Sequence, residues 1–106
     1  MPKYMVKASY TTDGVKGVLK EGGSGRRDTI AKLIEGLGGT MESFYFAFGD
    51  DDVYVTADLP DNVTAAAIAL AVNSTGAVNL KTVVLMTPEE IDEAGKRTVD
   101  YRPPGA

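Results

Sequence analysis

The chain has 106 residues, of which 43% are hydrophobic and 25% are charged, a composition that is ordinary for one globular domain. Eleven basic and fifteen acidic residues give a net charge of −4 without a basic stripe, which argues against a nucleic-acid or anionic-membrane partner. The sequence has no cysteine and no histidine, so disulfides, thiolate nucleophiles and the commonest ligands of zinc and haem are excluded.

The first part of the chain predicts a strand followed by an interrupted helix. Residues 3–10 alternate polar and apolar side chains with period two, as a strand does. Residues 11–13 offer capping side chains, and an apolar stripe with helical spacing then continues to the glycines at 38–39. The glycine-rich segment 22–25 is expected to break this helical region in the middle, because adjacent glycines are poor helix formers.

Residues 40–48 and 52–59 predict a β-hairpin with its turn at Asp50-Asp51. The predicted pairs are Phe48 with Val53, Phe46 with Val55 and Phe44 with Ala57. One face of the hairpin is then wholly apolar and is expected to lie under the helices, whereas a slip of one residue would mix aromatic and polar side chains. The opposite face carries Ser43, Tyr45 and Ala47 beside Tyr54, Thr56 and Asp58.

The remainder predicts a second helix, a last strand and a short third helix. Residues 60–62 begin an alanine-rich helix that ends at residues 74–76, and residues 77–86 form the strand. Residues 87–90, Thr-Pro-Glu-Glu, form a capping box for a helix that stops at Gly95. The prolines of the tail Tyr101-Arg102-Pro103-Pro104 prevent further helix, so the tail is either a stiff arm lying over a partner or a frayed end.

The order strand–helix–strand–strand–helix–strand predicts a single α+β domain over residues 1–106, with the ferredoxin-like βαββαβ fold. Both main helices should cover one face of a four-stranded antiparallel sheet and leave the other face bare. The bare face is expected to carry Met5, Lys7, Ser9, Tyr45, Tyr54, Val83 and Leu85. This mixture is too apolar for water and too polar for a core, so we expect two copies to pair face to face around a semi-enclosed cavity.

Several separated segments resemble the GYD domain family. They are Glu21–Arg27, Glu42–Gly49, Thr87–Ile91 and Tyr101–Gly105, and the likeness extends over nearly the whole chain. The resemblance implies a fold of the dimeric α/β barrel superfamily and a small bacterial homodimer. The chain departs from the family's naming motif, because residues 49–52 read Gly-Asp-Asp-Asp, with aspartate where the family has tyrosine. Any ligand role of that tyrosine is therefore in doubt here.

The glycine-rich segment is the first candidate site. Ser24 is expected to cap the resumed helix, and Arg26 and Arg27 would add bidentate contacts to a carboxylate or phosphate bound at its N-terminus. The lysine and hydroxyl of a P-loop are missing. The alternative, favoured on general grounds, is a helix kink with solvated arginines.

The aspartates at 50–52 are the second candidate, for a hard cation such as Ca²⁺ or Mg²⁺. Consecutive strand residues point to opposite faces, however, and aspartate is a preferred turn residue. We therefore expect an acidic turn and no metal site.

The polar side chains of the bare face are the third candidate: Lys7, Ser9, Tyr45, Tyr54, Thr56 and Lys81. A lysine desolvated in a dimer cavity would serve as a base and a tyrosine would donate to an oxyanion, so Lys7 and Tyr54 are the candidate catalytic residues. The alternative is that these groups satisfy one another across the interface.

These observations favour a cofactor-free homodimer that acts as a small-ligand-binding or regulatory protein, with an amphipathic or aromatic ligand. One alternative is a cofactor-free enzyme of the monooxygenase or isomerase type, by analogy with other dimeric barrels, and another is a structural dimer without a ligand. Neither the apolar core of a signal peptide nor an apolar run of about 20 residues is present, so a cytoplasmic location is expected.

Overall fold

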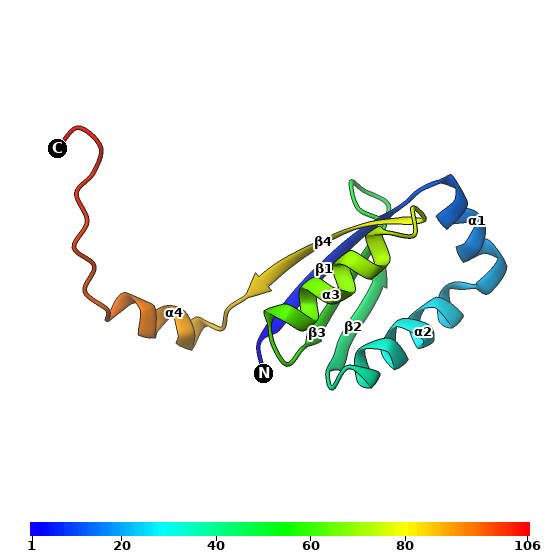
Figure 1. Cartoon of the computed structure of the whole chain (residues 1–106), viewed down its shortest axis with the longest axis horizontal. Helices are drawn as coiled ribbons and strands as arrows, with labels where there is room; N and C mark the ends of the chain where they lie inside the picture. Colours follow the sequence, from blue (N-terminus) through cyan, green and yellow to red (C-terminus); the bar gives the residue numbers. More distant parts are fainter.

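Four strands form one antiparallel sheet in the order β2-β3-β1-β4. The computed structural model describes all 106 residues. The elements in chain order are β1 (Lys3–Tyr10), α1 (Thr12–Glu21), α2 (Gly23–Gly36), β2 (Thr40–Phe46), β3 (Val53–Asp58), α3 (Asn62–Asn73), β4 (Val78–Leu85) and α4 (Pro88–Gly95). Helices α2 and α3 lie across the same face of the sheet (Figure 1). The predicted α+β ferredoxin-like fold is confirmed.

The expected break in the first helical region lies at Gly22. This residue has φ 87° and ψ 155°, a conformation that is essentially restricted to glycine, and it separates α1 from α2. The expectation that Ser24 caps the resumed helix is wrong. The N-cap is Gly22, without a side-chain hydrogen bond, and Ser24 lies inside the first turn of α2.

The register predicted for the hairpin is wrong by two residues. The observed pairs are Phe46 with Val53, Tyr45 with Tyr54, Phe44 with Val55 and Ser43 with Thr56. A shift of two keeps every side chain on its predicted face, because side-chain direction in a strand repeats every two residues. A bulge between Met41 and Ser43, which the prediction lacked, shifts the pairing by one further residue at the start of β2.

The shift arises because the connection between β2 and β3 is a loop over residues 47–52 and not a two-residue turn. The amide of Asp52 donates to the carbonyl of Ala8 in β1 at 2.8 Å, and the amide of Ala47 donates to the carbonyl of Asp52 at 2.8 Å. The chain therefore leaves the β2–β3 ladder before Phe48. The side chain of Phe48 is fully exposed instead of lying under the helices.

The core lies between the sheet and helices α2 and α3. Its buried side chains are Tyr4, Ala8, Ile34, Val53, Val55, Ala57, Leu59, Ala65 and Val78. Most of them alternate along β1 and β3, as the period-two pattern predicts. The apolar stripe of α1 packs less well, and Val15 and Leu19 remain exposed because α1 lies past the end of β1 (Figure 1).

Residues 86–106, which we call the arm, project away from this body (Figure 1). Thr87 begins α4 with the predicted capping box, yet no residue of the arm is buried. The radius of gyration is 17.0 Å, whereas about 13 Å is typical of a compact chain of this length. The arm thus has no packing partner within its own chain. No helix is both long enough and apolar enough to cross a membrane.

Candidate functional site

The face of the sheet opposite α2 and α3 is bare, as predicted (Figure 1). The strand pairing places the predicted residues together on it: Met5, Lys7, Ser9, Tyr45, Tyr54, Thr56, Val83 and Leu85. Tyr45 is 70% exposed and Val83 is 40% exposed, whereas the core side chains of β1 and β3 on the opposite face are at most 7% exposed. An isolated chain therefore presents a broad patch of mixed apolar and polar side chains to water.

Cross-strand neighbours order this face into rows. One row, which we call the tyrosine–lysine row, runs across all four strands as Tyr45, Tyr54, Lys7 and Lys81. The next row consists of Ser43, Thr56, Met5 and Val83, and the hydroxyl oxygens of Ser43 and Thr56 are 2.5 Å apart. Half of the second row is thus polar and already hydrogen-bonded, and the other half is apolar.

Lys7 is the least satisfied cation on this face. It lies directly between Tyr54 and Lys81 in the ladder and makes no ion pair within the chain. Lys3, by contrast, pairs with Glu42 and with Asp58. Like charges directly opposite each other destabilise a sheet, so the neighbouring lysines favour an anionic group above them.

The loop after β2 engages two more of the predicted residues. The hydroxyl of Ser9 donates to Oδ1 of Asp51 at 3.1 Å, and Lys81 Nζ lies 3.9 Å from the same oxygen. Oδ2 of Asp52 instead accepts the amide of Tyr10 at 2.9 Å. The carboxylates of Asp51 and Asp52 therefore tie the loop to β1.

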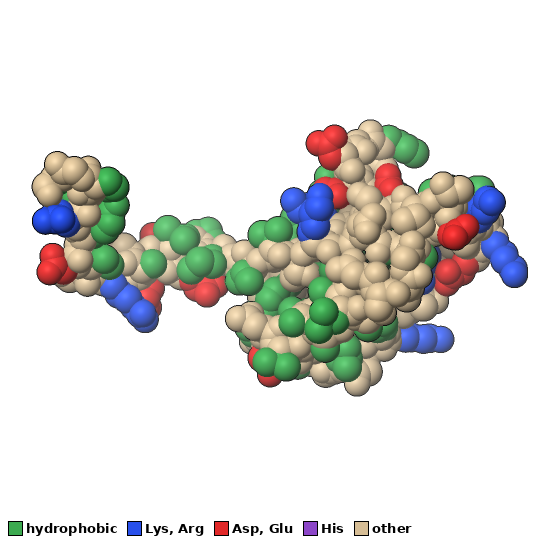
Figure 2. All heavy atoms as spheres, turned by 45° about the horizontal axis from the view of Figure 1, so that its top comes forward, with side chains coloured by type: hydrophobic (Ala, Val, Ile, Leu, Met, Phe, Trp, Pro, Cys, Tyr) green, Lys and Arg blue, Asp and Glu red, His purple; other side chains and the backbone are tan.

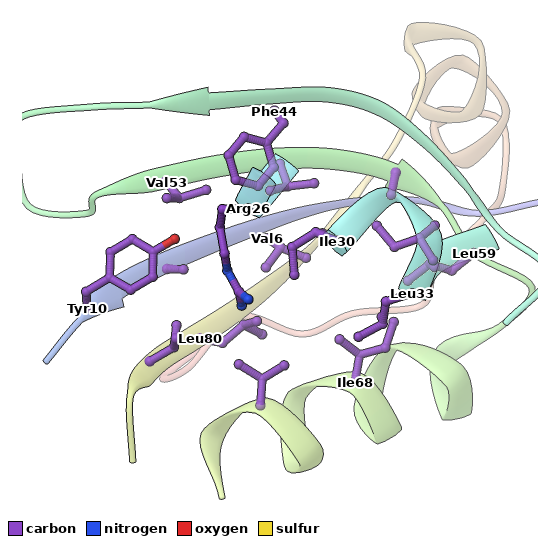
Figure 3. Close-up of a pocket in the computed structure, with 16 residues that line it drawn as sticks. Val6, Tyr10, Arg26, Ile30, Leu33, Phe44, Val53, Leu59, Ile68 and Leu80 are labelled. Atoms are coloured by element: carbon purple, nitrogen blue, oxygen red, sulfur yellow. The ribbon is translucent and has the colours of Figure 1, made fainter. Parts of the chain in front are cut away.

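The two arginines of the glycine-rich segment are not brought together. Arg27 is about half exposed and its Nε donates to Asp28 at 3.1 Å. Arg26 instead lies over a slot between α2, α3 and the sheet, with Tyr10 beside it (Figure 3). The predicted double-arginine anion site is therefore not assembled. Tyr10 was not among the predicted site residues, because the alternation of β1 marks it only as a core position.

The comparison with known families gives one finding. A sequence model described as the GYD domain matches residues 4–94, which include β2, β3 and β4 completely and all but one residue each of β1 and α4. No curated protein and no solved structure matches the chain. Since the match covers most of the 106 residues, the chain belongs to the GYD domain family.

Proposed function

We propose that the chain works as a homodimer that binds a small amphipathic or aromatic ligand between the bare faces of two sheets. The observation that carries this proposal is the tyrosine–lysine row, which lies on a face that no helix covers. Pairing two such faces removes the apolar side chains of Met5, Val83 and Leu85 from water. Polar side chains at the centre of the pairing would then line the ligand cavity.

The arm supports pairing independently of the sheet. Its exposed apolar side chains are Met86, Ile91, Val99 and Tyr101. Figure 2 shows hydrophobic side chains along this projecting segment. An eight-residue helix such as α4 is marginal in water without a packing surface. We therefore propose that the arm folds over the second copy and adds to the interface.

The chemistry of the row favours a ligand with an aromatic or apolar body and an acidic group. Lys7 and Lys81 supply adjacent positive charge, and the rings of Tyr45 and Tyr54 supply flat surfaces with hydroxyl donors at their ends. A cytoplasmic location and the absence of a cofactor are parts of the same proposal.

A second candidate is a cofactor-free enzyme of the monooxygenase or isomerase type. It is favoured by one feature, the direct cross-strand pairing of Lys7 with Tyr54. In this arrangement the lysine amine would take a proton and the phenol would donate to the developing oxyanion.

Two measurements test the proposal. Sedimentation should give a dimer, and aromatic acids, quinones and lactones should be screened for a rise in melting temperature, because a ligand that binds only the folded state stabilises it. Lys7→Met should weaken a binding acid by about tenfold, the loss expected for a charge-assisted hydrogen bond. The matched control is Lys16→Met on α1, an exposed lysine away from the face. A monomer, or equal effects of the two substitutions, would contradict the proposal.

Turnover separates the binder from the enzyme. If a screened compound is converted, Lys7→Met should abolish conversion, whereas in a binding protein no compound is consumed and only affinity changes. A dimer that binds none of the screened compounds would favour the structural alternative.

A further inference from the structure

The helix-covered side of the sheet contains an apolar slot, defined by α2 on one side, α3 on the other and the sheet beneath (Figure 3). Ile30 and Leu33 of α2 and Ile68 and Val72 of α3 form its walls. Fifteen of its sixteen lining residues are hydrophobic, and the cavity measures about 60 Å³. The slot is open because α2 packs mainly on β2 and α3 mainly on β4.

Arg26 is the one charged residue of the slot. Its guanidinium reaches from α2 across the slot toward Leu80 (Figure 3), and its side chain is only 25% exposed. Its nearest carboxylate oxygen, on Glu21, lies 3.9 Å away, which is beyond hydrogen-bonding distance. The other oxygen of Glu21 accepts the hydroxyl of Thr29 at 2.9 Å. Arg26 therefore holds five donors above an apolar cavity without a carboxylate within hydrogen-bonding distance.

Tyr10 lies at the same end of the slot (Figure 3). Burial raises the pKa of its phenol and outweighs the opposing effects of a hydrogen bond from Arg26 and of the positive charge of Arg26. The phenol is therefore protonated at neutral pH and has an O–H group to donate. One end of the slot thus combines a fixed positive charge with a neutral donor.

A second, more polar cavity of about 280 Å³ adjoins this end, beside α1. It shares Tyr10, Arg26, Val72 and Val78 with the slot, so the Arg26–Tyr10 pair stands at the boundary between the two cavities. Its outer wall includes Asp13 and Glu21. A ligand would enter through this cavity with its apolar end first, and a second carboxylate at that end would be buried among apolar side chains without a partner.

We propose that the slot between α2 and α3 is a second ligand site, separate from the dimer cavity, and that it binds a small monocarboxylate with a short, slender apolar body. The body occupies the slot, and the carboxylate accepts hydrogen bonds from the guanidinium of Arg26 and the hydroxyl of Tyr10. Because one chain supplies all of the residues, the site needs no partner.

The volume sets the size of the ligand. A water-sized group needs on the order of 10–15 Å³ by this measure, so about 60 Å³ holds four to six such groups. Hexanoate, with five carbons beyond its carboxylate carbon, is the probe of matching length. Hexan-1-ol has the same chain without the charge, and adipate has the same chain with a carboxylate at both ends.

The experiment is an NMR titration of the full chain with these three compounds. Hexanoate should shift the amide signals of α2 and α3 around Ile30 and Val72 in a saturable manner, and hexan-1-ol and adipate should bind at least tenfold more weakly. Arg26→Gln should weaken hexanoate binding by about tenfold, because a hydrogen bond to a charged group is lost. The matched control is Arg27→Gln, which should change the dissociation constant less than twofold because Arg27 points away from the slot and pairs with Asp28.

A third variant tests the cavity without touching the charge. Val72→Phe places a ring in the slot and should abolish hexanoate binding while Arg26 is still present. The proposal is overturned if hexanoate causes no saturable shifts, if hexan-1-ol binds as well as hexanoate, or if Arg27→Gln weakens binding as much as Arg26→Gln. It is also overturned if folded Val72→Phe binds hexanoate normally, and this result decides the matter even if Arg26→Gln fails to fold.

Discussion

Replacement of Val83 by aspartate is the sharpest test of face-to-face pairing. Val83 lies on β4, directly opposite Met5 on the bare face, and 40% of it is exposed in the isolated chain. Within one chain the substitution places a carboxylate at a solvent-accessible edge strand, where the free energy of unfolding should fall by less than about 1 kcal/mol. In a two-fold dimer the same substitution occurs twice at the interface.

The expected effect on the dimer follows from burial and charge. Complete burial of a valine side chain is worth about 1.5–3 kcal/mol, so covering the exposed 40% of Val83 contributes roughly 1 kcal/mol per copy. A carboxylate left unpaired in the interface adds a penalty of about 2 kcal/mol or more per copy. With two copies, Val83→Asp should destabilise the dimer by about 6 kcal/mol, which is more than about ten-thousandfold in the dissociation constant.

Sedimentation equilibrium across the micromolar range measures this constant directly. The control is Val63→Asp in the first turn of α3, which makes the same chemical change at a residue that is 78% exposed and far from the bare face. Aspartate is tolerated in the first turn of a helix, so the control should remain folded and dimeric. A Val83→Asp protein that sediments as the control does would show that the bare face is not the interface.

Three further predictions concern the joint between α1 and α2, the start of α3 and the arm. Gly22→Ala should lower the free energy of unfolding by about 1–3 kcal/mol because Gly22 has a positive φ. The control Gly17→Ala, at a position in open space within α1, should raise the free energy of unfolding by about 0.5–1 kcal/mol. If urea unfolding gives the two changes the same sign, Gly22 is not the break between the helices. The pKa of Asp61 lies below its usual range because the carboxylate accepts hydrogen bonds from the amide of Thr64, at 2.8 Å, and from the hydroxyl of Thr64. The ionised carboxylate therefore stabilises the folded state above the pKa of the unfolded state, and this stabilisation is lost as the pH falls through the lower pKa of the folded state. The free energy of unfolding of Asp61→Asn should be closer to that of the wild type at pH 2 than at pH 7. The same difference in free energy at both pH values would contradict this prediction. Ile91→Asp in α4 should weaken the dimer by at least about tenfold, because one buried aliphatic contact is lost in each copy. The melting temperature of the monomer should not change, and an unchanged dimer would show that the arm lies outside the interface.

The sequence predicted the faces of the sheet well, because side-chain direction in a strand is a local property. Tyr45 and Tyr54 share the bare face even though the hairpin register was wrong, since the error was an even number of residues. The register itself depends on a contact that local patterns do not contain. The amide of Asp52 is bound by the carbonyl of Ala8, more than forty residues away, and this contact lengthens the loop.

The slot was beyond prediction for a similar reason. The sequence alone does not distinguish Arg26 from Arg27, which are adjacent and of the same type. Successive helix residues point about 100° apart, so only one of them faces the sheet. The cavity exists because α2 and α3 pack on strands at opposite edges of the sheet. Helical periodicity marked Ile30 and Leu33 as core positions, and the incomplete packing between them and α3 is visible only in three dimensions.

The two proposed sites would bind an anion with the same few residue types. A chain without histidine has lysine and arginine as its cationic side chains for an anion, and each side of the sheet combines one of these with a phenol. On the bare face the pair is Lys7 and Tyr54, and in the slot it is Arg26 and Tyr10. Strand β1 contributes to both, because alternate side chains along a strand point to opposite faces. Such a strand would place the two proposed ligands on opposite sides of one sheet.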